Sequence, residues 1–139
     1  MTWVCNIDEV LNSASFVYLI TFPQTNEFYI GVKQVYVKVR NAKRIKPHSK
    51  QSNWMKYNSS STTVKSKIEN GEEHIKTILC TFPDTTKAAL VETILIAYFG
   101  TRPNSLNKAL MVKTSLQKDD GEQLKIITDL IERVLEYVK

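Results

Sequence analysis

The sequence predicts a small α/β (α+β) domain, in which helices flank a three-stranded antiparallel sheet in the order β-β-α-β-α-α. Three observations support this fold class. Two runs rich in Val, Ile, Phe and Tyr, residues 16–22 and 27–32, are separated by the turn sequence "PQTN". An apolar helical pattern covers residues 84–100, and an amphipathic pattern ends the chain at about 121–138. With 139 residues, the chain is long enough for one hydrophobic core, so residues 1–139 are expected to form a single domain.

The first two segments predict a β-hairpin, because Pro and Asn favour a turn between two strands. In this hairpin Tyr18 and Tyr29 could be cross-strand neighbours on one face. Aromatic residues in strands usually serve packing. Gly31 follows Tyr29 closely, and a glycine near a strand end allows another backbone or a ligand to approach.

Residues 33–58 are expected to form a basic loop, because the apolar periodicity of the hairpin is lost there. After this loop, Ser59, Ser60 and Ser61 are candidate N-caps of a short helix that Gly71 would end. The segment "EHIKTILCTF", residues 73–82, alternates enough to predict the third strand.

The second helix is predicted to begin at the N-cap Asp84 and to end at Gly100 as its C′ residue. Glu92 lies on the same face as Ala88 and Ile96 in this largely apolar helix. A carboxylate in apolar surroundings costs free energy unless it is paired or bound to a metal. Two hypotheses follow: a salt bridge to a nearby Lys or Arg, or a ligand for a divalent cation such as Mg²⁺.

The C-terminal amphipathic helix, about 121–138, would pack on the core or form a homodimer contact. Its apolar residues recur at steps of three and four: Leu124, Ile127, Leu130, Ile131, Val134, Leu135 and Val138.

The charge of the chain is unevenly distributed. Between Phe28 and Ile68 there is no acidic residue, and this segment holds ten of the nineteen basic residues. The rest of the chain therefore carries nine basic and fourteen acidic residues. A concentrated positive surface most commonly binds a phosphate backbone, so a nucleic acid is the expected partner. The alternative is a solvated loop whose charges only maintain solubility.

Several classes of protein are not expected. No apolar run approaches the ~18 residues that a membrane helix needs, and "MTWVCNIDEV" lacks the features of a signal peptide. The expected location is therefore cytoplasmic, inside the cell. Cys5 and Cys80 are far apart and are expected to be reduced thiols. Together with two scattered histidines they form no recognisable zinc site.

The motifs "FVY" and "FYIGVK", with "YIG" intact, resemble the core of the GIY-YIG nucleases. The segment "SNWMKYNSSSTTVKSKIENGEEHIKTIL" is similar to the W-x-x-Y-x-(G/S)-S segment of the phage-type members, which include homing endonucleases. Glu92 falls where the family carries its metal-binding Glu, and Asn107 in "SLNK" matches a later Asn. The resemblance covers residues 16 to about 110, the expected nuclease core.

This resemblance implies metal-dependent hydrolysis of a DNA phosphodiester by a small endonuclease. Glu92 would bind one Mg²⁺ or Mn²⁺ ion. Tyr18 would be the phenol that activates water, and Tyr29 would help to hold the nucleophile. Gly31 would make room at the site, and Asn107 would brace it by hydrogen bonds.

The resemblance also implies a basic residue that stabilises charge on the scissile phosphate. Arg40 is the first candidate, with Arg44 and Lys33 as alternatives. Tyr57 lies where related nucleases use a His or Tyr near the phosphate. Trp54 is expected to pack the loop down rather than to stack on a base. The full set of expected DNA contacts is Lys33, Lys38, Lys43, Lys46, His48, Trp54, Lys56, Ser59 and Ser60.

Two other hypotheses remain open at this point. The first motif lacks its Gly and the basic residue is not assigned uniquely, which favours a nucleic-acid-binding or protein-interaction module with weak or lost catalysis. A basic RNA-binding protein unrelated to nucleases would leave Glu92 unexplained. The first of these predicts DNA binding without cleavage.

Overall fold

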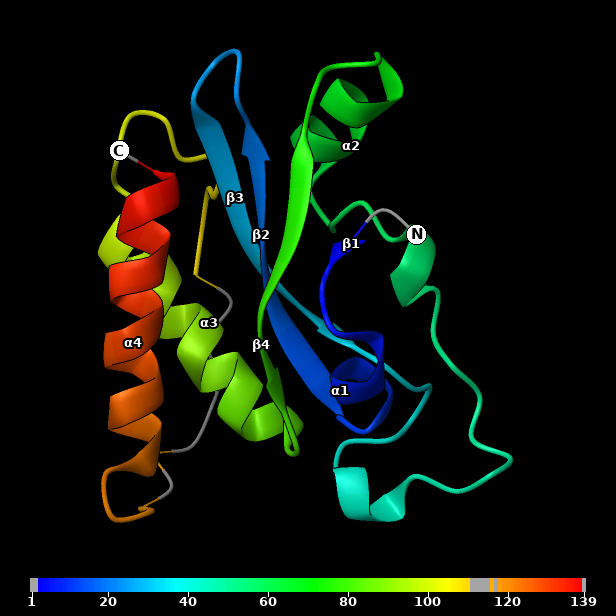
Figure 1. Ribbon diagram of the computed structural model, residues 1–139. Helices are drawn as coiled ribbons and strands as arrows, with labels where there is room; N and C mark the ends of the chain where they lie inside the picture. Colours follow the sequence, from blue (N-terminus) through cyan, green and yellow to red (C-terminus); the bar gives the residue numbers. More distant parts are fainter. Residues whose placement is uncertain (1–2, 111–115, 117, 139) are drawn as a thin grey trace.

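The computed structural model describes residues 3–110, 116 and 118–138 (Figure 1). In chain order, its elements are β1 (Trp3–Val4), α1 (Ile7–Leu11), β2 (Ser15–Phe22), β3 (Glu27–Gln34), the 3₁₀ turns η1 (Ala42–Arg44) and η2 (Trp54–Lys56), α2 (Thr62–Glu69), β4 (Ile75–Phe82), α3 (Thr85–Phe99) and α4 (Glu122–Tyr137).

The sheet has four strands in the order β1-β4-β2-β3, of which β4, β2 and β3 are the antiparallel strands that the sequence predicts. The predicted count and order were wrong at the N-terminus, where β1 pairs in parallel with β4 and α1 follows. Strand β1 has two residues and α1 has five. Strand β1 spans a single period and α1 little more than one, so neither contains a repeating hydrophobic pattern that the sequence could signal.

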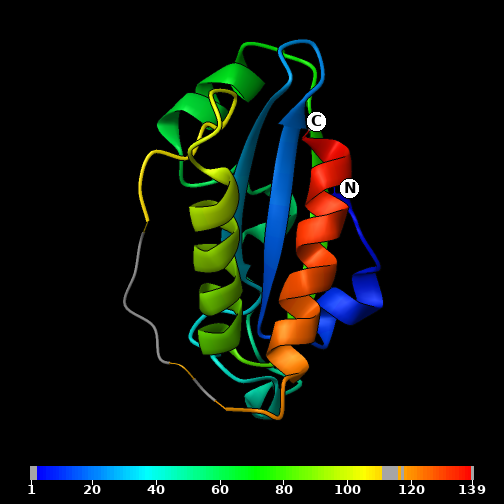
Figure 2. The ribbon, with the colours of Figure 1, turned by 90° about the vertical axis from the view of Figure 1, so that its left-hand side faces the viewer.

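Helices α3 and α4 cover one face of the sheet, and α1, α2 and the basic loop lie on the other (Figures 1 and 2). Each face has its own buried cluster. Val17, Leu19 and Ile30 of the sheet belong to the cluster that α3 and α4 share. On the opposite face, Tyr18 is buried in an aromatic cluster with Trp54.

The hairpin forms with the predicted geometry. Tyr18 is paired with Gly31, and Ile20 is paired with Tyr29. Tyr18 and Tyr29 are therefore diagonal neighbours on the same face of the sheet, and their ring centroids are 6.3 Å apart.

The predicted caps are confirmed at three of four helix ends. The Ser61 side chain accepts a hydrogen bond from the backbone of α2, and the Asp84 side chain does the same for α3. Gly71, with φ +80°, follows the end of α2. Gly100, in contrast, is the C-cap of α3 with a right-handed φ of −70°, so it is not the left-handed C′ residue predicted.

Helix α4 packs on the core. Ile127, Leu130, Val134 and Val138 are buried, whereas Leu124 is 67% exposed. The apolar stripe is thus largely used within the chain, and the homodimer contact stays a prediction. None of the helices in the described ranges is long and apolar enough to cross a membrane.

Candidate active site

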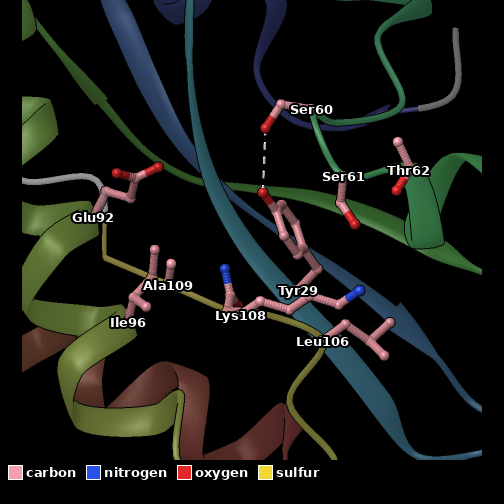
Figure 3. A pocket seen from close by; sticks show the side chains of 10 residues that line it. Tyr29, Ser60, Ser61, Thr62, Glu92, Ile96, Leu106, Lys108 and Ala109 are labelled. Atoms are coloured by element: carbon pink, nitrogen blue, oxygen red, sulfur yellow. Dashed lines mark hydrogen bonds between the residues drawn. The ribbon is translucent and has the colours of Figure 1, made fainter.

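A pocket of about 330 Å³ opens at the outer edge of β3 (Figure 3). Four segments line it: β3, the start of α2, the middle of α3 and the chain that follows α3. The lining residues are Tyr29, Ser60, Ser61, Thr62, Glu92, Ile96, Leu106, Asn107, Lys108 and Ala109. It thus brings together the three expected catalytic residues Tyr29, Glu92 and Asn107, and Ser60 from the expected DNA contacts.

The pocket has its position because the chain after α3 pairs with the outer edge of β3. The Phe28 amide donates to the Asn104 carbonyl (3.1 Å), and the Leu106 amide donates to the Phe28 carbonyl (2.8 Å). The Asn107 side chain then takes the place of a neighbouring strand: its Oδ1 accepts from the Ile30 amide (2.9 Å) and its Nδ2 donates to the Ile30 carbonyl (2.8 Å). These bonds satisfy backbone groups that an edge strand would otherwise expose.

Replacing Asn107 by Ala is expected to lower the free energy of unfolding by about 1–3 kcal/mol, because both groups of Ile30 lose their partner. Replacing it by Asp keeps one acceptor but removes the donor to the Ile30 carbonyl, and is expected to be destabilising as well. Urea unfolding of the two variants beside wild type checks this. Unchanged unfolding free energy in both would show that the side chain does not brace the edge.

The Glu92 carboxylate is held by a backbone amide of β3, two residues after Ile30. The backbone N–H of Val32 donates to the carboxylate, and this bond lowers the Glu92 pKa. Burial has the larger effect and raises the pKa of Glu92 to about 7. In the described part of the chain no Lys or Arg forms an ion pair with Glu92. The described residues thus form no salt bridge with Glu92, and its carboxylate lines the same pocket as Lys108.

The donor atoms around the pocket fit a hard divalent cation. They are oxygens: the Glu92 carboxylate, the Tyr29 phenol and the hydroxyls of Ser60 to Thr62. Among the described residues there is no cluster of three or more His, Cys, Asp or Glu side chains. A single carboxylate suits Mg²⁺, which keeps several waters and is usually completed by substrate phosphate oxygens.

Tyr29 lies inside the pocket, between the Glu92 wall and the start of α2 (Figure 3). Its hydroxyl shares a hydrogen bond of 3.3 Å with Ser60 Oγ. Tyr18, in contrast, is 1% exposed and lies in the aromatic cluster beside the pocket. Burial, followed by the charges of Tyr29, Tyr57 and Glu92, raises the pKa of the Tyr18 phenol far above its usual value.

Gly31 has a packing role that the structure makes explicit. The Tyr18 ring crosses directly over Gly31, so a Cβ there would lie 2.8 Å from Tyr18 Cε2 and closer still to the end of the ring. From the resemblance, this glycine was expected to make room at the site. The group that fills the room is the Tyr18 phenol.

Tyr57 joins the pocket to the aromatic cluster. Its ring meets the Tyr18 ring edge to face at 6.2 Å, and Lys33 Nζ lies 4.2 Å from its centroid. Burial raises the pKa of Tyr57, while hydrogen bonds with Ser60 and Tyr18 lower it. Burial also lowers the pKa of Lys33.

The structure places the two arginine candidates elsewhere. The Arg40 carbonyl accepts from the Thr85 amide (3.0 Å), which holds Arg40 at the first residue of α3. Arg44 ends η1 beside it. Both side chains are exposed and neither lines the pocket. Of the three basic candidates, Lys33 is the one beside Tyr57.

The expected DNA contacts divide into exposed and buried groups. Lys38, Lys43, Lys46, His48, Lys56 and Ser60 are exposed, and Lys33 is partly exposed. Trp54 and Ser59 are fully buried. Trp54 donates to Gln51 Oε1 (2.9 Å), and Ser59 Oγ accepts from the Ser61 amide (3.0 Å). The prediction that Trp54 and Ser59 contact DNA was therefore wrong, and both are structural residues. For Trp54, this is the packing role that was expected for an aromatic residue.

Two lysines were missed in the sequence. Lys108 lines the pocket and directly follows Asn107, so its position in "SLNK" was an available signal. Lys76 is buried in β4 at 2% exposure. Nothing in the alternation of "EHIKTILCTF" separates it from an exposed lysine of a half-buried strand.

Two comparisons with known proteins found a match for this chain. Residues 3–109 match the family model described as "endonuclease segE, GIY-YIG domain". The chain is also 34% identical over 103 residues to a protein named "Intron-associated endonuclease 2" from Enterobacteria phage T4. That match covers 73% of this chain but 35% of the relative, so the chain spans about a third of the relative's length. No solved structure matches.

Proposed function

The chain belongs to the GIY-YIG endonuclease family, and we propose that it is a metal-dependent endonuclease that hydrolyses DNA phosphodiester bonds at the pocket on the β3 edge. One observation carries the proposal: Glu92, a carboxylate that forms no ion pair with any described residue, shares this pocket with Tyr29. A structural carboxylate would be expected to have a countercharge.

Glu92 would hold the Mg²⁺ or Mn²⁺ ion, with the Val32 amide fixing the carboxylate. Such an ion supplies Lewis-acid stabilisation of charge on the phosphate oxygens. Bringing an ion to the site also favours the ionised form of Glu92, because a nearby positive charge opposes the effect of burial.

The residues of the chain itself would orient the reacting groups. Tyr29 and Ser60, which share a hydrogen bond in the pocket, would hold the attacking water. Burial keeps the Tyr18 phenol protonated at neutral pH, so in this arrangement Tyr18 donates hydrogen bonds rather than accepting a proton. The role of water-activating phenol, expected for Tyr18, would require an adjacent cation to lower its pKa.

Positive charge near the pocket would come from lysines. Lys108 lines the pocket and Lys33 lies against Tyr57, so these two are the proposed contacts to the phosphates next to the scissile bond. The exposed basic residues of the loop, including Arg40 and Arg44, would follow the DNA backbone further away. The relative's name, "Intron-associated endonuclease 2", supports the nuclease activity itself.

A catalytically inactive DNA-binding module is the second candidate. The burial of Tyr18 and the position of both arginines away from the pocket favour it. It predicts the same salt-sensitive DNA binding but no change in the DNA.

Supercoiled plasmid distinguishes the two candidates. Purified wild-type protein is expected to convert the plasmid to nicked or linear DNA in Mg²⁺ or Mn²⁺ and to leave it intact in EDTA. A gel-shift series at rising salt, run in EDTA, measures binding separately. Binding without cleavage in either metal would contradict the nuclease proposal and support the binding module.

A further inference from the structure

Lys76 is a lysine whose ammonium group is buried inside the domain. It lies in β4, opposite Trp3 of β1, and is 2% exposed. Its Nζ donates to the Tyr57 carbonyl (2.5 Å) and to Asn58 Oδ1 (2.9 Å), and it lies 4.3 Å from the centroid of the Trp3 ring. An ammonium has three donors, and here each has a partner, two oxygens and one aromatic face.

This arrangement is costly for a purely structural position. In the described part of the chain, no carboxylate forms an ion pair with Lys76. Burial of the ammonium accordingly lowers the pKa of Lys76 to about 8. An apolar residue of similar volume commonly fills such a place at equal or lower free energy, so stability alone gives little reason for a lysine here.

The segment that Lys76 holds leads directly into the pocket. Tyr57 reaches the Tyr18 ring, and three residues later Ser60 shares the hydrogen bond with Tyr29. Between them Ser59 has a left-handed φ of +80°, a conformation that costs free energy for a residue with a side chain. A backbone in this conformation needs fixed points on either side. Ser61, the N-cap of α2, is one of them, and the Lys76 ammonium is the other.

A second hydrogen bond, from Trp3, holds the same part of the loop. Trp3, whose ring faces the ammonium, donates from Nε1 to the Trp54 carbonyl (2.8 Å). Residues 54–58 are thus held by two hydrogen bonds from the sheet. Trp3 of β1 donates to the Trp54 carbonyl, and Lys76 of β4 donates to the Tyr57 carbonyl.

We propose that Lys76 is a positioning residue for the active site: its ammonium clamps the backbone at Tyr57 and Asn58 and so places Tyr57 against Tyr18 and Ser60 against Tyr29. It does not touch the pocket and takes no part in the chemistry. The consequence for catalysis rests on the proposed endonuclease function, whereas the clamp itself does not.

Lys76→Met tests the clamp because methionine keeps the length and apolar stem of the side chain and removes the charge and the donors. Lys125→Met, an exposed lysine on α4, is the matched control. Hydrogen exchange measured by mass spectrometry is the first readout, as it does not depend on activity. In Lys76→Met, exchange in residues 54–62 is expected to accelerate at least about tenfold, with β2, β3 and α3 unchanged.

Plasmid cleavage is the second readout. The turnover rate of Lys76→Met is expected to fall about 10- to 100-fold, while the KM and the DNA affinity stay within about twofold of wild type and the melting temperature within about 4 °C. Lys76→Arg, which keeps the charge, is expected to recover part of the turnover rate. A merely structural lysine would lower the melting temperature and the folded fraction and leave the turnover rate per folded molecule unchanged.

Asn58→Ala keeps the proposal testable if Lys76→Met does not fold. It removes one partner of the ammonium, so the same segment is expected to exchange faster and the turnover rate to fall by a smaller factor. Where both variants fold, their effects on turnover are expected to be less than multiplicative, because they disturb the same contact. Unchanged exchange in residues 54–62 would overturn the clamp even if the enzyme cleaves DNA. Faster exchange in an enzyme without cleavage would support the clamp and contradict the proposed function instead.

Discussion

Replacing Glu92 by Gln is expected to lower DNA cleavage at least about 100-fold, because the pocket loses the one carboxylate among its described lining residues. Gln has the same shape and still offers an oxygen to the Val32 amide, so the fold and the pocket are retained. DNA binding in EDTA is expected to stay within about twofold of wild type, because the basic loop supplies most of the contacts.

The same substitution is expected to stabilise the protein above neutral pH. Burial raises the pKa of Glu92 to about 7, above its unfolded value of 4.5. The folded state therefore binds the proton more tightly, and the ionised carboxylate destabilises it. This destabilisation is fully present above pH 7 and disappears as the pH falls through 7 towards 4.5. Discounted for the partial exposure of Glu92, the gain on substitution is about 1–2 kcal/mol at pH 8.

Urea unfolding in EDTA at pH 8 and pH 5 measures this effect, and Glu132→Gln, an exposed glutamate on α4, is the control. Glu92→Gln is expected to exceed wild type in unfolding free energy at pH 8 and to differ little at pH 5. A variant that is less stable than wild type at pH 8 would mean that Glu92 has a structural partner. A stable variant that no longer cleaves DNA would identify a group retained for function at a cost in stability.

Replacing Gly31 by Ala is expected to have the largest effect of any single methyl group added to the hairpin. The new Cβ would overlap the ring of Tyr18, which cannot move aside because Trp3, Phe16 and Tyr57 surround it. Overpacking of this kind typically costs about 1–3 kcal/mol. The displaced phenol would also disturb Tyr29 and Tyr57, so cleavage is expected to fall with stability.

A double-mutant cycle separates the overlap from other effects of alanine in a strand. In a Tyr18→Leu background the end of the ring is absent, and Gly31→Ala is expected to cost much less unfolding free energy than in wild type. Thermal and urea unfolding of the four proteins provide the comparison. An equal cost in both backgrounds would show that Tyr18 does not account for the glycine.

The fold could be predicted from the sequence where the pattern repeats over many residues. The hairpin, β4, α3 and α4 all contain several periods of hydrophobic residues, and Asp84 and Ser61 carry the local chemistry of N-caps. Strand β1 could not be predicted, because its two residues are recognisable as a strand only through the pairing of Trp3 with Lys76. This is a long-range contact that no local pattern encodes.

The candidate site divides in the same way. Glu92 and Tyr29 stood out because a carboxylate in an apolar helix and a tyrosine two residues before a strand glycine are locally unusual. The basic residue at the site could not be chosen from spacing, since the loop folds Arg40 back to the start of α3 and leaves Lys33 beside Tyr57. Lys76 has no local signature at all, because its burial depends on a carbonyl nineteen residues away.

Plasmid cleavage by wild type and by Glu92→Gln, purified side by side and assayed in Mg²⁺, tests the central claim most directly. The account predicts that wild type nicks or linearises the plasmid, that EDTA stops the reaction, and that Glu92→Gln binds the same DNA without cleaving it. Equal cleavage by the two proteins would contradict the account, because it would place the chemistry outside the pocket that Glu92 and Tyr29 share.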